Sequence, residues 1–249
     1  MRVVRVFTGE DVRYGLADGS SITLISDEPF AAWETEDVVG LTGARLMPPA
    51  MPTKIVCVGV NYKSHALEMD HDLPTEPLIF LKPPTSMNAP MGEIHIPESS
   101  KRVDYEGELA VVMGRRTHRV SEADALSCVL GYTCANDVTA RDLQARDGQW
   151  TRAKGFDGFC PLGPWVETDV DPSDLLVETF VNGVRKQSAR TSDMIFSVPR
   201  LISFISHVMT LLPGDVILTG TPAGIGQLHS GDTVEVRIEG VGSLTNRVV

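Results

Sequence analysis

The spacing of apolar and polar residues predicts short β-strands near the N-terminus. Three apolar runs are separated by turns rich in Gly and Asp: Val3–Phe7, Val12–Ala17 and Ser21–Ile25. This pattern is typical of a small antiparallel meander, and we expect a short helix over Glu28–Val39 to follow it. Three prolines then occur between residues 46 and 52, which indicates a connector because proline interrupts regular elements. We therefore predict a small β-rich N-terminal domain over residues 1–50 and a second domain over residues 51–249.

The second domain shows the same preference for short strands. The predicted strands cover residues 54–59, 78–81, 104–113, 132–138, 175–181, 184–187, 215–219, 233–239 and 243–249. Asn182-Gly183, between two of these strands, is a strong hairpin signal. Helical spacing is found in three stretches: residues 60–69, 121–131 and 197–212. The pattern predicts an α+β protein dominated by β-structure.

Composition narrows the class of protein. With 42% hydrophobic and 22% charged residues, the chain is typical of a soluble globular protein. The formal net charge of −11 argues against a nucleic-acid partner, because phosphate binding requires clustered Lys and Arg. The N-terminus lacks the apolar core of a signal peptide, and the most apolar window, residues 201–212, is too short to span a bilayer. We expect a cytoplasmic protein that has no membrane partner.

The cysteines support the same expectation. None of the four belongs to a C-x-x-C pair: Cys57, Cys128, Cys134 and Cys160. Cysteines that are far apart or lie in apolar runs are usually buried free thiols of a reducing compartment. We predict no disulfide framework.

Two acidic residues begin an apolar strand. Glu106 and Glu108 stand two positions apart, so in a strand both project from the face that also carries Ala110 and Val112. Adjacent carboxylates repel each other and lose hydration on burial unless a cation lies between them. Carboxylate oxygens suit Mg²⁺, Mn²⁺ or Ca²⁺. For an isolated E-x-E motif, however, a solvated strand face is the more frequent explanation.

Other polar residues extend this candidate site. Asp137 ends a predicted strand and offers a third carboxylate, which leaves three octahedral positions for water or a chelating substrate; taken alone, it caps a turn as readily. Arg141 and Lys154 follow closely, and a local positive charge favours an anionic substrate. His65 and Glu68 are neighbours on one helical face. They suit an acid–base pair in which the carboxylate orients the imidazole, but an ordinary solvated face has the same spacing.

The loop Gly220–Gly226 follows a strand directly and is rich in glycine. Such loops expose backbone N–H groups that hold a carboxylate or a phosphate, although a structural turn explains the glycines equally well. The glycine spacing fits neither the P-loop nor the dinucleotide fingerprint. The sequence also lacks G-x-S-x-G and H-E-x-x-H, which disfavours serine-nucleophile and zinc-protease chemistry.

The order of these motifs resembles the fumarylacetoacetate hydrolase family. Five segments within residues 52–249 carry the resemblance: Gly59–Glu68, Asp104–Ala110, Asn136–Gln144, Lys154–Asp157 and Thr219–Gly226. The first fifty residues carry none of it. Gly148 departs from the pattern, because it stands where the larger fumarylacetoacetate-cleaving members have a tyrosine that contacts the substrate. The chain therefore resembles the small, broad-specificity branch of the family.

The resemblance implies a fold, a metal and a set of residue roles. The expected fold is a fumarylacetoacetase C-terminal-domain-like mixed β-roll or sandwich, usually in a homodimer. The implied metal ligands, for Mg²⁺ or Mn²⁺ with Ca²⁺ as a substitute in crystals, are Glu106, Glu108 and Asp137. The implied catalytic residues are the water-activating pair His65 and Glu68 and the electrophilic Lys154. The implied contacts to the carboxylate and keto oxygens of the substrate come from Arg141, Gln144 and Thr221.

Members of this family cleave or isomerise short 2-oxo acids, some of them in aromatic catabolism. Our first hypothesis is a metal-dependent hydrolase of C–C bonds in acylpyruvate or fumarylpyruvate-type 2-oxo acids, acting through a metal-stabilised enolate. The alternatives that share this enolate are 2-hydroxyhepta-2,4-diene-1,7-dioate isomerase and oxaloacetate decarboxylase. The outcome would depend on whether His65 delivers hydroxide, and on what the polar segment 70–77, expected to be mobile, excludes. A non-catalytic 2-oxo-acid-binding protein is the alternative from another class.

Overall fold

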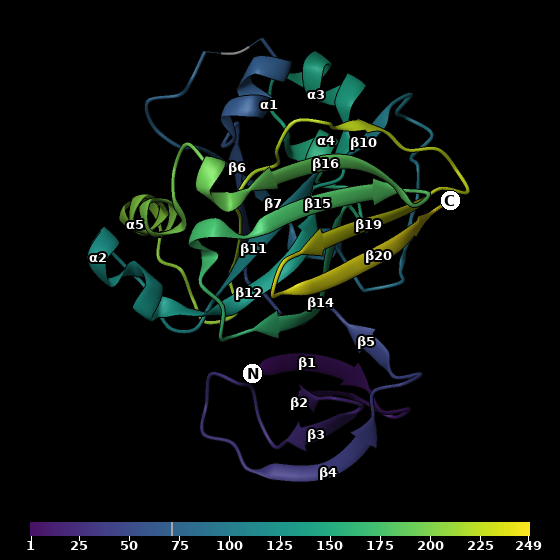
Figure 1. The fold of residues 1–249 in the computed structure, drawn as a ribbon, viewed down its shortest axis with the longest axis vertical. Helices are drawn as coiled ribbons and strands as arrows, with labels where there is room; N and C mark the ends of the chain where they lie inside the picture. The colour runs from purple at the N-terminus through teal and green to yellow at the C-terminus, as the bar shows by residue number, and fades with distance from the viewer. Residues whose placement is uncertain (71) are drawn as a thin grey trace.

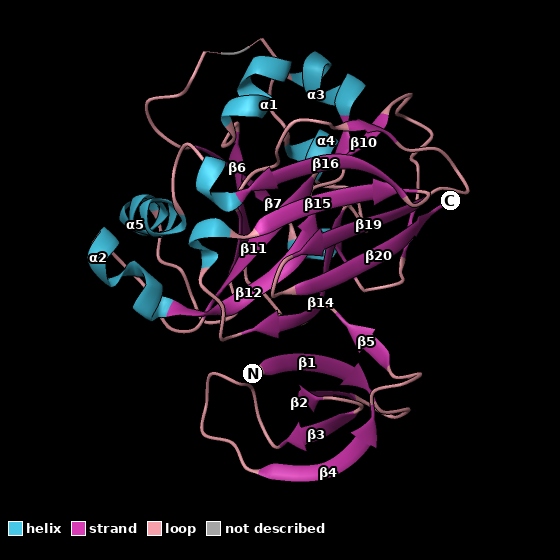
Figure 2. Cartoon of the chain, viewed as in Figure 1, coloured by secondary structure: helices cyan, strands magenta, loops and turns pink. Residues whose placement is uncertain are grey.

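The fold is built mainly from β-sheets, as predicted for a β-rich α+β protein (Figure 2). The computed structural model describes residues 1–70 and 72–249. In these residues the largest sheet has twelve strands. Its order is β4 (Thr35–Gly40), β3 (Ser21–Ile25), β2 (Val12–Asp18), β1 (Arg2–Phe7), β14 (Cys160–Glu167), β12 (Val129–Asn136), β11 (Gly107–Met113), β17 (Val216–Leu218), β6 (Ile55–Gly59) and β7 (Leu78–Lys82), with β5 (Arg45–Met47) paired to β1 and β8 (Met87–Asn88) paired to β14.

A second sheet faces the middle of the first (Figure 1). Its five strands are ordered β16 (Val184–Arg190), β15 (Leu176–Val181), β19 (Thr233–Ile238), β20 (Gly242–Val248) and β9 (Glu93–Ile94). The hairpin predicted at Asn182-Gly183 joins β15 to β16. A short third sheet contains β13 (Thr139–Ala140), β10 (Val103–Tyr105) and β18 (Gly226–Gln227). This arrangement confirms the expected fumarylacetoacetase C-terminal-domain-like fold.

Strand β11 lies at the centre of the large sheet, between β12 and β17, and all of its residues are buried. Its side chains alternate between two apolar clusters. Leu109, Val111 and Met113 belong to the cluster that also contains Val177 and Val236 of the five-stranded sheet. The cluster on the other side of β11 contains Ala110 and Val112. The alternation predicted from the sequence is confirmed, and it fixes the direction in which the acidic residues at the start of β11 point.

The helices are short and lie around the sheets. They are α1 (Lys63–Glu68), α2 (Glu122–Ala125), α3 (Arg141–Asp147), α4 (Thr151–Lys154) and α5 (Val198–Val208), with the 3-10 turns η1 (Pro84–Ser86), η2 (Leu126–Cys128), η3 (Pro172–Asp174) and η4 (Thr191–Asp193). In Figure 1, α1, α3 and α4 gather at one end of the molecule, while α2 and α5 lie together at its side. The first group of helices surrounds the candidate site.

Two helix predictions are wrong because strand pairing overrides local propensity. The helix expected over Glu28–Val39 is replaced at its C-terminal end by β4, which extends the meander by pairing with β3. The helix expected over residues 121–131 is limited to α2, followed by the turn η2. Val129, expected in that helix, begins β12 and pairs with Met113 of β11. In the first case the strand forms because it pairs with β3, and in the second case it forms because it pairs with β11.

The third predicted helix is present as α5 but ends at Val208 rather than near Leu212. Beyond it, Leu211 forms an antiparallel bridge with Thr117, with backbone bonds in both directions at 2.8 and 2.9 Å. The last apolar residues of the predicted helical stripe therefore lie in extended backbone. Proline and glycine at 213–214 follow this bridge rather than the helix.

The N-terminal meander continues the large sheet. Strand β1 pairs with β14, with Val3 opposite Val166, while β1 to β3 also carry their own apolar cluster around Val4, Val6 and Ile22. Figure 1 shows this part at the opposite end of the molecule from α1 and α3. The division of the chain at residue 50 remains a prediction.

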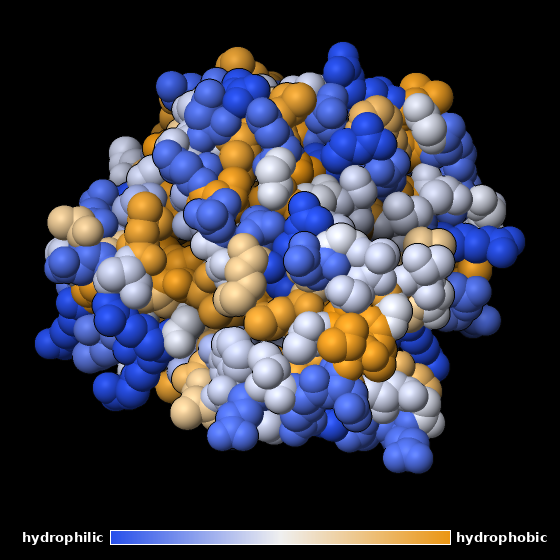
Figure 3. Space-filling view, turned by 60° about the horizontal axis from the view of Figure 1, so that its bottom comes forward, coloured by the Kyte–Doolittle hydropathy of each residue, from blue (hydrophilic) through white to orange (hydrophobic). Residues whose placement is uncertain are grey.

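The exterior is mixed in character. Figure 3 shows polar groups over much of the drawn face, with apolar groups reaching the surface in patches. No helix in the described part of the chain is long and apolar enough to cross a membrane. The predicted state of the cysteines is confirmed, since all four are buried and free: Cys57, Cys128, Cys134 and Cys160.

Candidate active site

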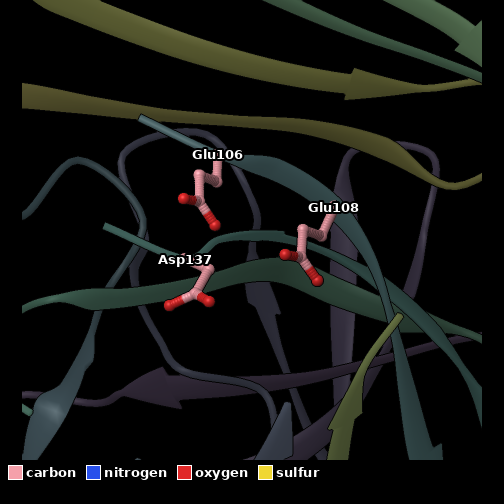
Figure 4. A group of neighbouring side chains, drawn as sticks. All are labelled: Glu106, Glu108 and Asp137. Carbon is pink, nitrogen blue, oxygen red and sulfur yellow. The ribbon is translucent and has the colours of Figure 1, made fainter. Parts of the chain in front are cut away.

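Three carboxylates meet where β11 begins (Figure 4). Glu106 immediately precedes β11, Glu108 lies within it, and Asp137 immediately follows β12. Because Gly107 pairs with Asn136, the start of one strand lies beside the end of the other. One oxygen from each carboxylate lies within 4.8 Å of the other two, and the three residues are 5% exposed or less. The structure thus brings together the three residues expected as metal ligands.

Two lysines contact Asp137, one at each of its carboxylate oxygens. Lys154 Nζ lies 2.7 Å from Asp137 Oδ2 and 2.8 Å from Glu106 Oε2. Lys82 Nζ lies 2.5 Å from Asp137 Oδ1 and also donates to the carbonyl oxygens of Val138 and Phe159 at 3.1 and 2.7 Å. Burial would lower the pKa of Lys154, but the carboxylates of Asp137 and Glu106 raise it above its usual value. Lys154 is therefore a fixed cation.

Glu106, like Asp137, contacts two cations. Besides Lys154, its Oε1 accepts hydrogen bonds from Arg141 Nη2 and, at 3.2 Å, from Thr139 Oγ1. Burial would raise the pKa of Glu106, but Lys154 and Arg141 outweigh it and hold that pKa well below the usual value. Glu106 is therefore ionised over the physiological pH range.

Glu108 has the opposite environment. Its Oε2 accepts one short hydrogen bond, 2.6 Å, from the backbone N–H of Gly220. Among the described residues, no Lys or Arg forms an ion pair with it. Burial, followed by the negative charges of Asp137 and Glu106, raises the pKa of Glu108 well above its usual value.

A divalent cation between the three carboxylates would give Glu108 the positive neighbour that Glu106 and Asp137 already have. Hard oxygen donors of this kind are what Mg²⁺ and Mn²⁺ prefer, so the donor set fits such an ion.

The His–Glu pair forms on α1, as the i, i+3 spacing indicates. His65 Nδ1 lies 3.0 Å from Glu68 Oε2, and Glu68 Oε1 accepts a hydrogen bond of 2.9 Å from the backbone N–H of Gly224. We assign the proton to Nδ1, because a neighbouring carboxylate favours that tautomer. His65 is 7% exposed and lines the same cavity as the carboxylates. Its Nε2 is then available to accept a proton.

The segment between β6 and α1 positions this pair. Val60 has a φ of +54°, a left-handed conformation that a β-branched residue adopts at a cost and that is concentrated at functional sites. Asn61 is buried and donates from Nδ2 to Thr219 O at 2.7 Å and Phe196 O at 3.0 Å, while its Oδ1 accepts from Phe196 N at 2.8 Å. These bonds tie the start of α1 to the end of β17.

The three residues expected to bind substrate also line this cavity. Arg141 is held by Asp104 at 3.0 Å and donates from Nη1 to Gln144 Oε1 at 2.7 Å, which leaves the Gln144 amide N–H groups for a ligand. The Thr221 hydroxyl donates to Gly107 O at 2.9 Å and accepts from Gln187 Nε2 at 2.8 Å. In this conformation the hydroxyl proton of Thr221 is therefore engaged within the protein.

The cavity has a volume of about 470 Å³, which is within the usual range for small-molecule sites. Its lining contains the ionic groups described above. It also contains six apolar side chains: Val58, Val60, Met69, Phe80, Ala145 and Trp150. The segment 70–77, predicted to be mobile, follows α1, and its residue 71 lies outside the described residues.

Sequence reasoning missed two residues of this site, Lys82 and Gln187. Lys82 ends β7, two positions after Phe80, so alternation places both on one face; this signal could have been read from the sequence. Gln187 lies in β16, where its Oε1 accepts from Gly107 N at 3.0 Å and its Nε2 donates to Thr221 Oγ1 and Pro222 O. No short-range pattern distinguishes Gln187, because its partners come from two distant strand ends.

The chain is similar to known enzymes over most of its length. Residues 54–249 match the fumarylacetoacetate (FAA) hydrolase C-terminal family, and residues 1–49 match an Rv2993c-like N-terminal family. The structure of 2-hydroxyhepta-2,4-diene-1,7-dioate isomerase from Mycobacterium marinum is 47% identical, with a TM-score of 0.93 over 100% of this chain and 98% of that one.

Two more distant relatives carry other activities. Fumarylpyruvate hydrolase from Pseudomonas aeruginosa, solved in complex with Mn²⁺ and pyruvate, is 33% identical, with a TM-score of 0.76 over 82% of this chain and 91% of that one. The mitochondrial oxaloacetate tautomerase Fahd2a of Rattus norvegicus is 42% identical over 215 residues, covering 82% of this chain and 69% of that protein. The similarity therefore spans a hydrolase, an isomerase and a tautomerase.

Proposed function

The chain belongs to the fumarylacetoacetate hydrolase family, and we propose that it is a divalent-metal-dependent hydrolase of C–C bonds in acylpyruvate-type 2-oxo acids. The observation that carries this proposal is the content of one cavity: three buried carboxylates, a fixed ammonium group and a histidine oriented by a carboxylate. The histidine is what favours hydrolysis, because tautomerisation and decarboxylation need no activated water.

The metal would be Mg²⁺ or Mn²⁺, held by Glu106, Glu108 and Asp137. Support comes from the hard donor set, from the position of Glu108 without a cationic partner among the described residues, and from the Mn²⁺ and pyruvate in the fumarylpyruvate hydrolase structure. When bound, the ion supplies a Lewis acid for the keto and carboxylate oxygens of a 2-oxo acid.

The protein side chains account for the proton transfers. His65 Nε2 takes a proton from water while Glu68 holds the ring through Nδ1. The resulting hydroxide attacks the distal carbonyl carbon, and the C–C bond breaks so that its electron pair moves onto the pyruvate fragment as an enolate. The ammonium group of Lys154, which lines the cavity, stabilises this negative charge. Protonation of the enolate carbon then gives pyruvate and a carboxylic acid.

A second candidate is an isomerase or tautomerase that uses the same site. It is favoured by the 47% identity to the diene-dioate isomerase and by the 42% identity to the oxaloacetate tautomerase. Both activities, like oxaloacetate decarboxylation, need the enolate but no attack by water. Under this alternative, His65 would move a proton of the substrate instead.

A substrate panel decides between the two candidates. Acetylpyruvate, fumarylpyruvate, oxaloacetate and a hydroxyheptadienedioate are each incubated with the protein and Mg²⁺, Mn²⁺ or EDTA, and products are followed by absorbance and chromatography. We expect C–C hydrolysis to be the fastest reaction and EDTA to abolish it. No turnover of any of the four substrates with either metal would refute the proposal.

The variant His65→Asn separates the reactions. A general base contributes about 10²–10⁴-fold to a rate, so hydrolysis should fall by about that factor while oxaloacetate decarboxylation is largely retained. Equal losses in both reactions would contradict the role of His65 as the residue that activates water.

A second copy of this chain is the protein partner we propose, on the basis of the family. Apolar patches of the kind visible in Figure 3 are compatible with such an interface. Light scattering should give twice the 27.0 kDa mass of one chain; a mass of one chain at working concentrations would remove this part of the proposal.

A further inference from the structure

The lining of the cavity includes apolar side chains that the proposed chemistry does not use. The bulkiest of these side chains are Met69, Phe80 and Trp150, which we call the Met69–Phe80–Trp150 wall; Val60 and Ala145 also line the cavity. They come from three separate elements: the end of α1, strand β7 and the start of α4. A wall assembled from distant segments around a cavity is a candidate binding surface.

The aromatic part of the wall begins directly beside the fixed ammonium group. Trp150 and Lys154 are four residues apart across α4, and Trp150 O accepts the backbone N–H of Lys154 at 3.0 Å, so both side chains lie on one helical face. The rings of Trp150 and Phe80 meet edge to face, with centroids 5.1 Å apart and planes at 76°. Lys154 Nζ lies 5.1 Å from the centroid of Phe80. A ligand that contacts Lys154 therefore has these rings close beside it.

Gly59 allows the Trp150 ring to lie where it does. A Cβ atom at position 59 would lie 3.0 Å from Trp150 Cζ3 and 3.2 Å from Leu78 Cδ2, closer than ordinary van der Waals contact. A side chain at this position would therefore press against the indole ring, which would have to shift. The apolar wall and the site share this strand, since β6 leads directly into the segment that carries His65.

The charges of the cavity leave no cation for a second carboxylate. Of the described residues that line it, Arg141 and Lys154 are the ones with permanent positive charge. Arg141 is bound to Asp104 and Glu106, and Lys154 to Glu106 and Asp137. Both cations are therefore already paired with carboxylates. A carboxylate at the far end of a substrate would lose hydration against Met69 and the aromatic rings without a compensating partner.

We propose that the Met69–Phe80–Trp150 wall is a subsite for an apolar acyl substituent, so that this enzyme prefers acylpyruvates with an alkyl or aryl chain over those with a second carboxylate. This inference rests on the proposed function. The reaction is R–CO–CH₂–CO–COO⁻ plus water, giving R–COO⁻, pyruvate and a proton. Water supplies the oxygen to the acyl carbon, and the broken C–C bond becomes a C–H bond of pyruvate.

The test is a series of substrates that share the reacting group and differ in R. Values of kcat/KM are measured with Mg²⁺ for acetylpyruvate, butanoylpyruvate, benzoylpyruvate and fumarylpyruvate. Burial of one methylene group should raise kcat/KM by about fourfold, so butanoylpyruvate should exceed acetylpyruvate by roughly 15-fold. Fumarylpyruvate should be the poorest of the four. A preference for fumarylpyruvate would overturn the inference.

Three variants locate the effect in the wall. Trp150→Ala and Gly59→Ala should each lower the ratio of the benzoylpyruvate to the acetylpyruvate value, with about a tenfold drop for Trp150→Ala. Met69→Lys should raise the ratio of fumarylpyruvate to butanoylpyruvate by about tenfold or more, because it adds a charged donor. Trp33→Ala is the matched control, since Trp33 does not line the cavity, and it should change neither ratio.

The outcomes separate this inference from the function on which it rests. Turnover of acetylpyruvate with no preference for apolar chains, or with ratios that Trp150→Ala and Met69→Lys leave unchanged, would refute the subsite alone. No turnover of any acylpyruvate would refute both. If Trp150→Ala does not fold, the ratios from Gly59→Ala and Met69→Lys decide the question, because both changes lie at partly exposed positions.

Discussion

Replacing Lys82 by methionine tests how the third carboxylate of the site is held. The side chain of Lys82 is fully buried, and its Nζ donates to Asp137 Oδ1, Val138 O and Phe159 O. Methionine is unbranched and apolar, with a similar length. Lys82→Met therefore removes one charge and three donated hydrogen bonds while keeping most of the buried volume.

The expected cost is large in the absence of metal. Asp137 would keep Lys154, at 2.7 Å, as its cationic partner, and Phe159 O would keep the bond from Val138 N. Removing one member of a buried ion pair costs about 3–5 kcal/mol. A divalent ion adds positive charge beside the same carboxylate, so it should recover part of this loss. The free energy of unfolding should fall by about 3–5 kcal/mol in EDTA and by less in Mg²⁺.

Urea unfolding of both proteins, in EDTA and in Mg²⁺, measures the two differences. Lys54→Met is the control, because Lys54 also pairs with a buried carboxylate, Asp215, but is 21% exposed and lies outside the cavity. Asp215 would keep its bonds from Thr53 and Leu212. The control should also lose stability, because Asp215 is fully buried, but the loss should be the same in EDTA and in Mg²⁺.

Either of two results would refute the reasoning about Lys82. One is a loss of less than about 1 kcal/mol in EDTA. The other is a large loss that Mg²⁺ leaves unchanged, since the ion and Lys82 would then not act on the same carboxylate.

Three further changes test other parts of the site and core. Glu108→Gln keeps the side-chain shape but removes the charge that lacks a cationic partner. In EDTA the melting temperature of this variant should therefore equal or exceed that of the parent protein, and Mg²⁺ should no longer raise it. A lower melting temperature in EDTA would contradict this. Leu109→Ala, on the opposite face of β11, should cost about 2–5 kcal/mol in urea unfolding, and a changed KM would show that the two faces are not independent. Titration calorimetry should find that Mg²⁺ strengthens pyruvate binding and that pyruvate strengthens Mg²⁺ binding by the same factor; pyruvate binding indifferent to Mg²⁺ would argue against a shared site.

Local patterns predict most of the strands and the carboxylate pair. The alternation along β11 is a property of adjacent residues, so it places Glu106 and Glu108 on one face and Leu109 on the other without knowledge of the fold. The His65–Glu68 pair is equally local, because three residues span almost one helical turn. These features are set by residues close together in sequence, and the tertiary structure only brings them together in the interior.

The remaining features depend on contacts between distant segments. Val129 becomes part of a strand because Met113 pairs with it, and no pattern within residues 121–131 records this. Lys82 follows an apolar run, where a lysine usually reaches solvent. It is buried because β7 pairs with β6 and because Asp137 arrives from the end of β12. Gln187 connects Gly107 to Thr221 for the same kind of reason.

If the proposed function is correct, the charges of the site fit the state formed during C–C cleavage better than they fit the substrate itself. Three cations, Lys82, Lys154 and Arg141, contact the carboxylate group and match the three negative charges when all are ionised. A bound divalent ion then leaves an excess of two positive charges. A 2-oxo monocarboxylate brings one negative charge, whereas its enolate carries two. Binding that strengthens as negative charge develops lowers the reaction barrier. This stabilisation requires no second carboxylate on the substrate, in agreement with the apolar Met69–Phe80–Trp150 wall.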